Sequence, residues 1–310
     1  MSHLFLGVDG GQSSTKALIG DASGRVLGRG VAGPCNHVSA AEAKAKFLRT
    51  IRECVGTAIV DAGLPSDVVF EAACFGMSGG PEDKESLLRD AVAAERWLVT
   101  HDALIALSGA LGGEDGIVVI AGTGSIAFGR RGSQTMRAGG WGYIFGDEGG
   151  AFWIVREALR AALRTEEGWG PATALRSRLL ASTGTTSAYE ALHAFYTPDW
   201  HRSKVGKIAV EVSAAASEGD ETAISILKSA GAHLAGPVEA IQAKLWPSTT
   251  TAEASYIGGV FQDAIVLATF TSQLEAKQTA RVHPPVWDAA GGALIEALRL
   301  AGISARIREA

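Results

Sequence analysis

The chain has 310 residues, 47% of them hydrophobic, and a formal net charge of −5. This length suggests about two domains, and the composition can supply each with an apolar core. The negative charge argues against nucleic acid or an anionic membrane surface as partner, because both attract basic stripes. No uncharged apolar run reaches about 18 residues, so we expect no transmembrane helix.

The N-terminus and the cysteines suggest where the protein works. The first three residues lead straight into an apolar run, without the charged and apolar regions of a signal peptide. The cysteines, Cys35, Cys54 and Cys74, are widely spaced and form no C-x-x-C pair. We therefore expect free thiols, no zinc site and a cytoplasmic location.

Three strands open the chain. Apolar runs predict strands at 4–8, 15–20 and 26–31, the last two joined by a turn at 21–24. The first two are separated by the letters DGGQSST, which is longer than a simple hairpin needs. A turn this rich in glycine and hydroxyl groups indicates a ligand.

Helices and strands then alternate. Helical spacing predicts helices at 40–62, 84–95 and 103–111. Apolar runs predict a strand at 70–75 and a short buried strand at 97–100. Alternation of this kind is typical of an α/β domain.

The opening pattern returns at residues 116–140, again as strand, small-residue turn, strand, polar turn and strand. Its first turn begins about 112 residues after the corresponding turn of the opening segment. Internal repetition predicts two similar α/β domains that face each other across a cleft. The alternative is that two glycine-rich hairpins occur by chance in a chain with 39 glycines.

The remainder is mostly helical. A strand at 255–259 runs into a Gly-Gly turn with a helix after it, and the last predicted helix is 291–300. Short hinges are expected, because no low-complexity linker occurs. Between the second hairpin and that strand, helical spacing predicts helices at 151–163, 171–180, 187–195, 203–218 and 221–245.

The DGGQSST turn has the composition of a phosphate site. Consecutive backbone amides at a glycine turn form a nest for anions, and hydroxyl groups add donors. Asp9, at the strand end, is placed to hold Mg²⁺, which prefers few carboxylates together with water and phosphate oxygens. The turn matches neither the P-loop nor the G-x-G-x-x-G pattern. The candidate cofactor-binding residues here are Gly10, Gly11, Gln12, Ser13, Ser14 and Thr15.

The second turn, with the letters GTGS, is of the same kind. Gly122, Thr123 and Gly124 are candidate phosphate contacts, and Ser125 follows them. Two such turns on opposed halves can hold one polyphosphate between them. Phosphoryl transfer suits such an arrangement, because it needs positioning, charge stabilisation and a metal.

Asp102 follows the predicted short strand and begins a helix. One interpretation is an N-cap, which stabilises a helix by about 1 kcal/mol. The other is a general base that accepts the proton of a substrate hydroxyl. The residues alone leave both open.

Residues 139–154, GGWGYIFGDEGGAFWI, combine an indole, two acids and flanking glycine turns. Carboxylates accept hydroxyls in pairs, and an aromatic ring packs on a sugar face. Asp147 could again be a helix cap. Asn36 and His37, on a loop after the first hairpin, also suit sugar polar groups.

These segments, with "HDA" and "YIGGVF", occur in an order and spacing that resemble a known family. It is the N-acetylglucosamine kinase branch, of the BadF/BadG/BcrA/BcrD ATPase type, within the sugar kinase/Hsp70/actin superfamily. The resemblance implies an α/β, two-domain actin-like ATPase (ribonuclease H-like) fold, duplicated, with its active site in the interdomain cleft. The expected domains are 1–112 plus 290–310 for sugar and phosphate, and 113–289 for nucleotide, with helical insertions.

The resemblance also implies an activity and residue roles. The activity is phosphorylation of the 6-hydroxyl of an amino sugar, first of all N-acetylglucosamine, with ATP and Mg²⁺. Asp102 would be the catalytic base, and Gly258 and Gly259 would lie beside the nucleotide. A homodimer is expected. The sugar would be contacted by Asn36, His37, Ser125, Gly140, Trp141, Gly142 and Asp147.

One position departs from the family pattern. Relatives acting on N-acetylglucosamine often have Asn after the GTGS turn, where this chain has Ile126. Glucosamine or N-acetylmuramate is therefore an alternative substrate. An ATPase that activates a partner protein is a second alternative, although the cysteines do not match the cluster-binding motif of such activators.

Overall fold

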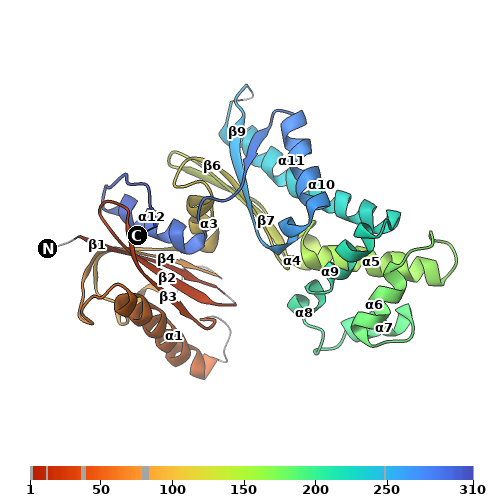
Figure 1. Ribbon diagram of the computed structural model, residues 1–310, viewed down its shortest axis with the longest axis horizontal. Coiled ribbons are helices and arrows are strands. Elements are labelled where there is room, and N and C mark those ends of the chain that lie inside the picture. The colour runs from red at the N-terminus through yellow and green to blue at the C-terminus, as the bar shows by residue number, and fades with distance from the viewer. Residues whose placement is uncertain (1–2, 12, 36–39, 79–83, 248, 310) are drawn as a thin grey trace. The chain divides into compact units, whose positions relative to one another are not determined.

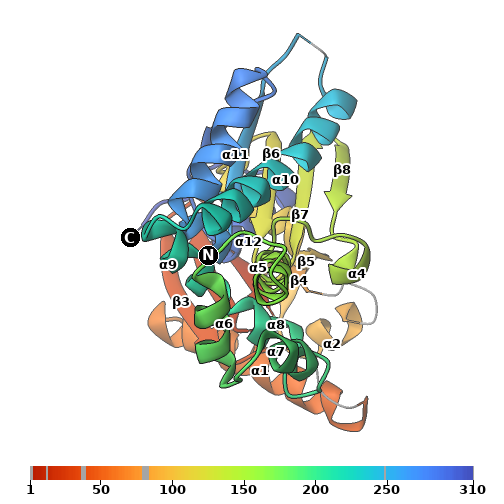
Figure 2. The same ribbon diagram turned by 90° about the vertical axis from the view of Figure 1, so that its right-hand side faces the viewer.

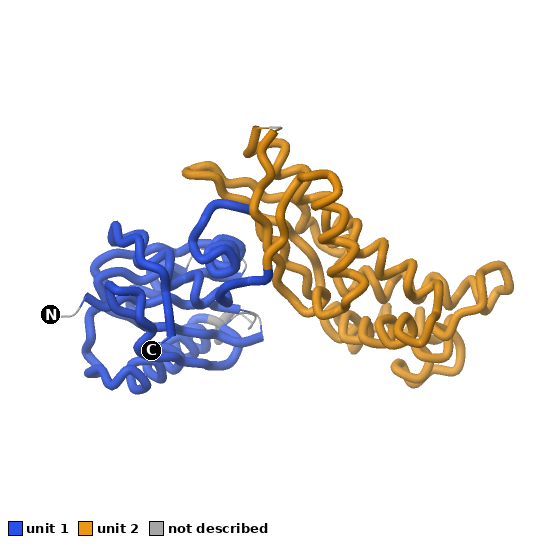
Figure 3. The backbone as a smooth tube through the Cα atoms, turned by 45° about the horizontal axis from the view of Figure 1, so that its top comes forward, with its two compact units in different colours: residues 1–116, 284–310 blue, residues 117–283 orange. Residues whose placement is uncertain are grey.

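A computed structural model describes residues 3–11, 13–35, 40–78, 84–247 and 249–309. The chain forms two compact units (Figure 3). Unit 1 comprises Met1–Gly116 and Pro284–Ala310, and unit 2 comprises Ile117–His283. The domain boundaries that the resemblance implies, 112/113 and 289/290, differ from these positions by four and six residues.

Unit 1 contains a five-stranded sheet in the order β3-β2-β1-β4-β5 (Figure 1). The first three strands are antiparallel neighbours, whereas β4 and β5 run parallel to β1. The carboxyl ends of β1, β4 and β5 therefore meet at one edge. The strands are β1 (Leu4–Gly10), β2 (Thr15–Asp21), β3 (Val26–Ala32), β4 (Phe70–Met77) and β5 (Ala94–His101).

Helices cover both faces of this sheet (Figure 1). Side chains alternate along β1, so Leu6 packs with the core under α1 (Ala40–Asp61), whereas Phe5 packs with α12 (Ala289–Leu300). Gly7 lets the backbone of α12 lie directly on the strand, because a Cβ there would overlap it. The remaining helices of unit 1 are α2 (Glu85–Arg89) and α3 (Asp102–Ala110).

The sheet of unit 2 has the order β10-β9-β6-β7-β8. If the strands are numbered in chain order within each unit, both sheets have the order 3-2-1-4-5, with the sheet of unit 2 read from β8 to β10. This shared order confirms the predicted duplication and its α/β class. The strands are β6 (Gly116–Ala121), β7 (Ser125–Arg131), β8 (Gln134–Gly139), β9 (Ala252–Ile257) and β10 (Ala280–His283).

Unit 2 carries many more helices than unit 1. The long helix α10 packs on β7 and β8 and runs alongside α11 (Figure 2). One large apolar core joins these helices to the sheet. The helices are α4 (Gly142–Phe145), α5 (Ala151–Glu166), α6 (Leu175–Thr183), α7 (Ala188–Phe195), α8 (Arg202–Gly206), α9 (Ala209–Ser217), α10 (Glu221–Leu245), η1 (Gly259–Gln262) and α11 (Ala264–Ala276).

Several predicted elements differ from the structure. The helix expected at 84–95 ends at Arg89, and β5 is longer and more exposed than expected because it is an edge strand with β4 as its sheet neighbour. The helix expected at 203–218 is two helices, α8 and α9, which break at Lys207 and Ile208. The sequence analysis missed β10, since its four residues, ARVH, give little periodic signal.

Candidate active site

The parallel strands of unit 1 bring the first acidic residues to one sheet edge. Asp9 lies opposite Gly76 of β4, and Gly76 lies opposite Thr100 of β5. Because β5 leads directly into α3, Asp102 emerges at the same edge as Asp9. The topology thus unites two acids that are far apart in the sequence.

Asp102 is the first residue of α3 and does not cap it. The cap residue is His101, which makes no side-chain cap hydrogen bond. The Oδ2 atom of Asp102 instead accepts a hydrogen bond from Oγ of Ser78, at 2.8 Å. The capping interpretation is therefore wrong, and the carboxylate remains available for other chemistry.

Ser78 is a residue that the sequence analysis missed. Its amide donates to the carbonyl of Gly10 at 3.1 Å, so it connects the DGGQSST turn to Asp102. Its own carbonyl accepts from Nζ of Lys84, at 2.9 Å. The sequence feature that could have identified Ser78 is its place in a glycine-rich loop after β4, the parallel neighbour of β1.

Asp9 has a perturbed pKa. Its pKa is raised to about 6, first by burial and then by the negative charges of Asp102 and Asp288. Lys16, whose Nζ lies 2.9 Å from Oδ2 of Asp288, acts in the opposite direction. A cation bound near Asp9 would relieve the burial cost and the repulsion together.

The donor set at this edge suits Mg²⁺. Within the described ranges, no group of three or more His, Cys, Asp and Glu side chains is arranged to hold a metal. Mg²⁺ commonly binds one or two carboxylates and completes its shell with water and substrate phosphates. Asp9 as a single carboxylate fits that pattern.

The turn after β1 is tightly built. The amide of Gly11 donates to the carbonyl of Ser14 at 3.1 Å. A Cβ at Gly10 would overlap Sδ of Met77, so a larger residue there would require the Met77 side chain to move. Thr15 is buried and its hydroxyl donates to Gly33, so this hydroxyl serves the fold of unit 1. The predicted site residues Gln12, Asn36 and His37 lie outside the described residues.

In unit 2, the GTGS turn lies against the start of α5. The amides of Ala151 and Phe152 donate to the carbonyls of Gly122 (2.8 Å) and Thr123 (3.1 Å). The amide of Gly122 donates to the carbonyl of Gly124, at 2.9 Å. These bonds fix the turn in one conformation.

The structure brings Asp147 and Ser125 to this turn. Asp147 is only 6% exposed and has a left-handed backbone, with φ of 60°. A Cβ at Gly124 would overlap its Oδ2 atom, which shows how closely the two residues approach. The hydroxyl of Ser125 donates to the carbonyl of Glu148 at 2.7 Å. A strained acid held against a glycine turn is typical of functional sites.

Asp147 is paired with Arg202, a residue that the sequence analysis missed. Nη2 of Arg202, at the start of α8, donates to Oδ2 of Asp147 at 3.0 Å. The Arg202 guanidinium also lies 5.2 Å from the ring centre of Tyr143. Nothing in the surrounding letters, TPDWHRSKVG, marks Arg202 as different from a surface arginine.

The segment before Asp147 is largely exposed. Trp141 is 67% exposed, and the Arg137 guanidinium lies 4.7 Å from the ring centre. Trp141 packs on Gly146, next to Asp147, because a Cβ at Gly146 would lie 3.1 Å from that of Trp141. Gly140 and Gly142 both have positive φ, and Gly140 packs against Ile126.

A cavity of about 650 Å³ lies within unit 2. Gly122 of the GTGS turn and Gly259 of the later glycine turn both line it. The two turns follow β6 and β9, which are parallel neighbours, and a Cβ at Gly258 would overlap the carbonyl of Ala121. This volume is in the usual range for a small-molecule site of about 300–1,000 Å³. Its walls come from the turns, α5 and α8 to α11, through Ala151, Ile154, Gly206, Lys207, Ala209, Val210, Ser213, Ser217, Leu227, Val260, Gln262, Asp263, Ala264 and Ile265.

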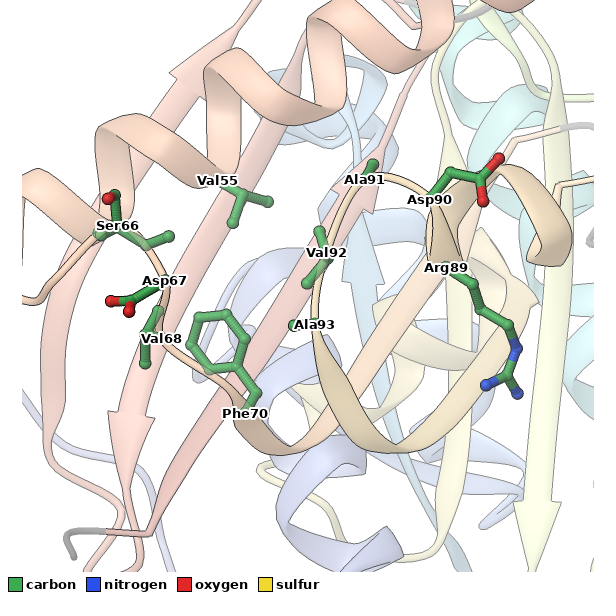
Figure 4. A pocket seen from close by; sticks show the side chains of 11 residues that line it. Val55, Ser66, Asp67, Val68, Phe70, Arg89, Asp90, Ala91, Val92 and Ala93 are labelled. Atoms are coloured by element: carbon green, nitrogen blue, oxygen red, sulfur yellow. The ribbon is translucent and has the colours of Figure 1, made fainter.

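A second cavity, of about 450 Å³, lies in unit 1 between α1, the loop before β4 and the loop before β5 (Figure 4). Phe70 and Val92 form its apolar side, and Asp67, Arg89 and Asp90 bring charges to its rim. None of the predicted site residues line this cavity.

In the part of the chain that the structure describes, no helix is long and apolar enough to cross a membrane.

Comparison with known proteins gives a consistent result. Residues 6–297 match the model of the BadF/BadG/BcrA/BcrD ATPase family. An N-acetylmuramic acid/N-acetylglucosamine kinase of Clostridium acetobutylicum is 30% identical over 264 residues, covering 83% of this chain and 85% of its own. An N-acetyl-D-glucosamine kinase of Dictyostelium discoideum is 30% identical over 261 residues, covering 78% and 80%.

A solved structure shows the same fold. It is described as a candidate N-acetylglucosamine kinase from Chromobacterium violaceum and superimposes with a TM-score of 0.74. The identity is 24%, and the match covers 94% of this chain and 98% of that one. With the duplicated sheets, this match shows the two-domain actin-like ATPase fold. The chain therefore belongs to the BadF/BadG/BcrA/BcrD ATPase family.

Proposed function

We propose that the protein transfers the terminal phosphoryl group of ATP to the 6-hydroxyl of an amino sugar, with N-acetylglucosamine as its first substrate. The observation that carries the proposal is the Asp102 carboxylate, which is bound by Ser78 and is not used as a helix cap. Relatives at 30% identity are named as kinases of N-acetylglucosamine, which supports the same chemistry.

Unit 1 supplies the proton acceptor. As the sugar oxygen bonds to phosphorus, the bond from phosphorus to the bridging oxygen of ADP breaks. The proton of the sugar hydroxyl passes to the Asp102 carboxylate, and Ser78 keeps that carboxylate oriented. Gly10, Gly11, Ser13 and Ser14 are proposed to contact the phosphates. Mg²⁺, when bound at Asp9, neutralises phosphate charge.

Unit 2 supplies the nucleotide and sugar contacts. The cavity that Gly122 and Gly259 line is proposed to hold the nucleoside, and Gly258 precedes Gly259 in the later glycine turn. Thr123 and Gly124 continue from Gly122 and are proposed to contact the phosphates. The proposed sugar contacts in this unit are Ser125, Gly140, Trp141, Gly142 and Asp147. The resemblance adds Asn36 and His37 in unit 1.

The test is ADP release by the purified protein with Mg²⁺ and ATP against a panel of acceptors. The panel contains N-acetylglucosamine, glucosamine, N-acetylmuramic acid, N-acetylmannosamine, glucose and a blank. ADP release only with N-acetylglucosamine would support the proposal, whereas preference for another amino sugar would reassign the substrate. Equal release in every tube, including the blank, would show an ATPase that acts on a partner protein.

Two further features rest on the resemblance and on the sequence alone. We propose a homodimer that works in the cytoplasm. Light scattering coupled to size exclusion would measure the mass of the assembly, and a monomer at micromolar concentration would contradict the dimer. Imaging of a tagged chain in its own cell would test the location.

A further inference from the structure

The proposed phosphate contacts of unit 2 include no positive charge. Gly122, Thr123 and Gly124 are backbone and hydroxyl contacts only, and the amide of Gly122 already donates to the carbonyl of Gly124. In unit 1, Lys16 is already paired with Asp288 at 2.9 Å. Phosphoryl transfer spreads negative charge over three oxygens, and a positioned cation commonly stabilises it. A cation that touches the GTGS turn is therefore of special interest.

Arg202 touches this turn. A Cβ at Gly124 would lie 2.9 Å from Nη2 of Arg202, so the guanidinium is in contact with the turn backbone. The other end of the same helix is also close, because a Cβ at Gly206 would lie 3.6 Å from Cγ2 of Thr123. Gly206 and Lys207 line the proposed nucleoside cavity. Helix α8 therefore lies against the turn at both of its ends, with Gly206 near Thr123 and Arg202 near Gly124.

The guanidinium of Arg202 has donors to spare. It carries five N–H groups, of which Nη2 donates to Asp147. Among the residues that the structure describes, its buried Nε has no acceptor. Burying an unpaired N–H is unfavourable, so such a group in a native fold needs an explanation. The side chain as a whole is 39% exposed, which leaves the guanidinium within reach of a ligand.

We propose that Arg202 donates a hydrogen bond to the terminal phosphoryl group of the bound nucleoside triphosphate, in addition to holding Asp147. The inference rests on the proposed function, since it names a further contact in the same site. Placed between Asp147 and the GTGS turn, Arg202 would select triphosphate over diphosphate. Its contact with the transferred group makes it a catalytic residue and more than a support for Asp147.

The test compares binding of two nucleotides by calorimetry in the presence of Mg²⁺. The probes are ADP and the non-hydrolysable ATP analogue AMPPNP. In Arg202→Met we expect AMPPNP to bind about tenfold more weakly or worse, because a charge-assisted hydrogen bond is lost, while ADP stays within about twofold. Arg202→Lys keeps the positive charge but lacks the planar set of donors of a guanidinium. It should lose less AMPPNP affinity than Arg202→Met.

Two controls isolate the contact. Arg160→Met removes an exposed arginine of α5 that pairs with Glu157, and it should change neither affinity. Asp147→Asn removes the negative charge beside Arg202 but keeps an oxygen that can accept its hydrogen bond, so it should leave the ratio of the two affinities within about threefold of wild type. Thermal unfolding of each variant reports folding. If Arg202→Met is unfolded, the ratio of ADP affinity to AMPPNP affinity in Arg202→Lys decides whether Arg202 contacts the terminal phosphoryl group.

Three outcomes would overturn the inference. The first is equal weakening of ADP and AMPPNP, the second is no weakening of either, and the third is the same selective loss in Asp147→Asn. A wild type that binds neither nucleotide would overturn the proposed function as well. A wild type that binds both but phosphorylates no sugar would overturn the sugar assignment alone, and the affinity ratio would still decide the role of Arg202.

Discussion

The two sheets share one strand order, but the edges that follow their first strands differ in charge. In unit 1 the edge carries Asp9 and Asp102, with Asp288 close enough to raise the pKa of Asp9. In unit 2 the corresponding turn carries glycines, and its one buried acid, Asp147, is paired with Arg202. Duplication therefore conserved the frame, while the chemistry of the two edges diverged.

This difference indicates a division of work between the units. An edge of repelling carboxylates suits a metal ion and a proton acceptor. A glycine turn with a nearby guanidinium suits phosphate and neutral hydroxyl groups. Substitutions at the two edges should therefore have different signatures, in turnover for one and in ligand affinity for the other.

The largest effect is expected at the acidic edge. Asp102→Asn removes the proton acceptor while keeping the hydrogen bond from Ser78 possible, so kcat should fall by about 10²–10⁴. The measurement is steady-state ADP release with saturating sugar and ATP. Asp67→Asn, at the rim of the second cavity in unit 1, is the matched control and should keep wild-type turnover. Near wild-type kcat in Asp102→Asn would remove the base assignment.

A steric change should show how tightly the second edge is packed. Gly124→Ala would overlap the Asp147 carboxylate and push it from Arg202, so we expect a loss of about 1–3 kcal/mol of stability. The KM for sugar should rise more than the KM for ATP. Gly236→Ala in α10 meets no atom within 4 Å and serves as control. Equal stability of the two variants in urea unfolding would contradict the close contact.

The charge at Asp9 should be visible in stability at different pH values. Its folded pKa of about 6 lies above the ordinary aspartate value of 3.8, so the folded state holds the proton more tightly. The contribution of Asp9 to the free energy of unfolding is favourable below about pH 4 and is lost as pH rises through about 6. The total loss is about 3 kcal/mol. Without metal, Asp9→Asn should therefore be more stable than wild type at pH 8 and lose this advantage at pH 4.

Urea unfolding in EDTA at the two pH values measures this difference. Asp67→Asn is again the control, because it removes an exposed acid from the same unit. A stability gap between Asp9→Asn and wild type that does not change with pH would show that Asp9 is not perturbed by its surroundings. Added Mg²⁺ and nucleotide should narrow the gap at pH 8, since they favour the ionised carboxylate.

Local sequence predicted much of the frame and part of the site. Glycine turns after apolar runs marked both phosphate-type turns, and repetition of the pattern predicted the duplicated sheets. Asp9 and Asp102 could be found because each follows a strand predicted from the sequence, and parallel strands end at a common edge. The family resemblance was needed to favour a base over a cap at Asp102.

The rest depends on contacts that no local pattern encodes. Ser78 reaches Asp102 only because β4 lies between β1 and β5 in the sheet. Arg202 lies 55 residues after Asp147, in a segment where the break between α8 and α9 was itself not predicted. The short strand β10 became regular through pairing with β9, since its own letters carry little strand signal.

The smallest expected effect concerns the choice of sugar. Ile126 packs against Gly140, one of the proposed sugar contacts, at the position where the family resemblance led us to expect Asn. Ile126→Asn would add an amide that can hydrogen-bond a sugar, so KM for N-acetylglucosamine should fall by about two- to tenfold, with kcat little changed. Ile126→Val keeps the apolar contact and should leave KM unchanged. If Ile126→Asn instead raises the KM of every sugar in the panel, the apolar side chain itself shapes the pocket, and the edge of unit 2 has diverged further from its relatives than its glycine turn suggests.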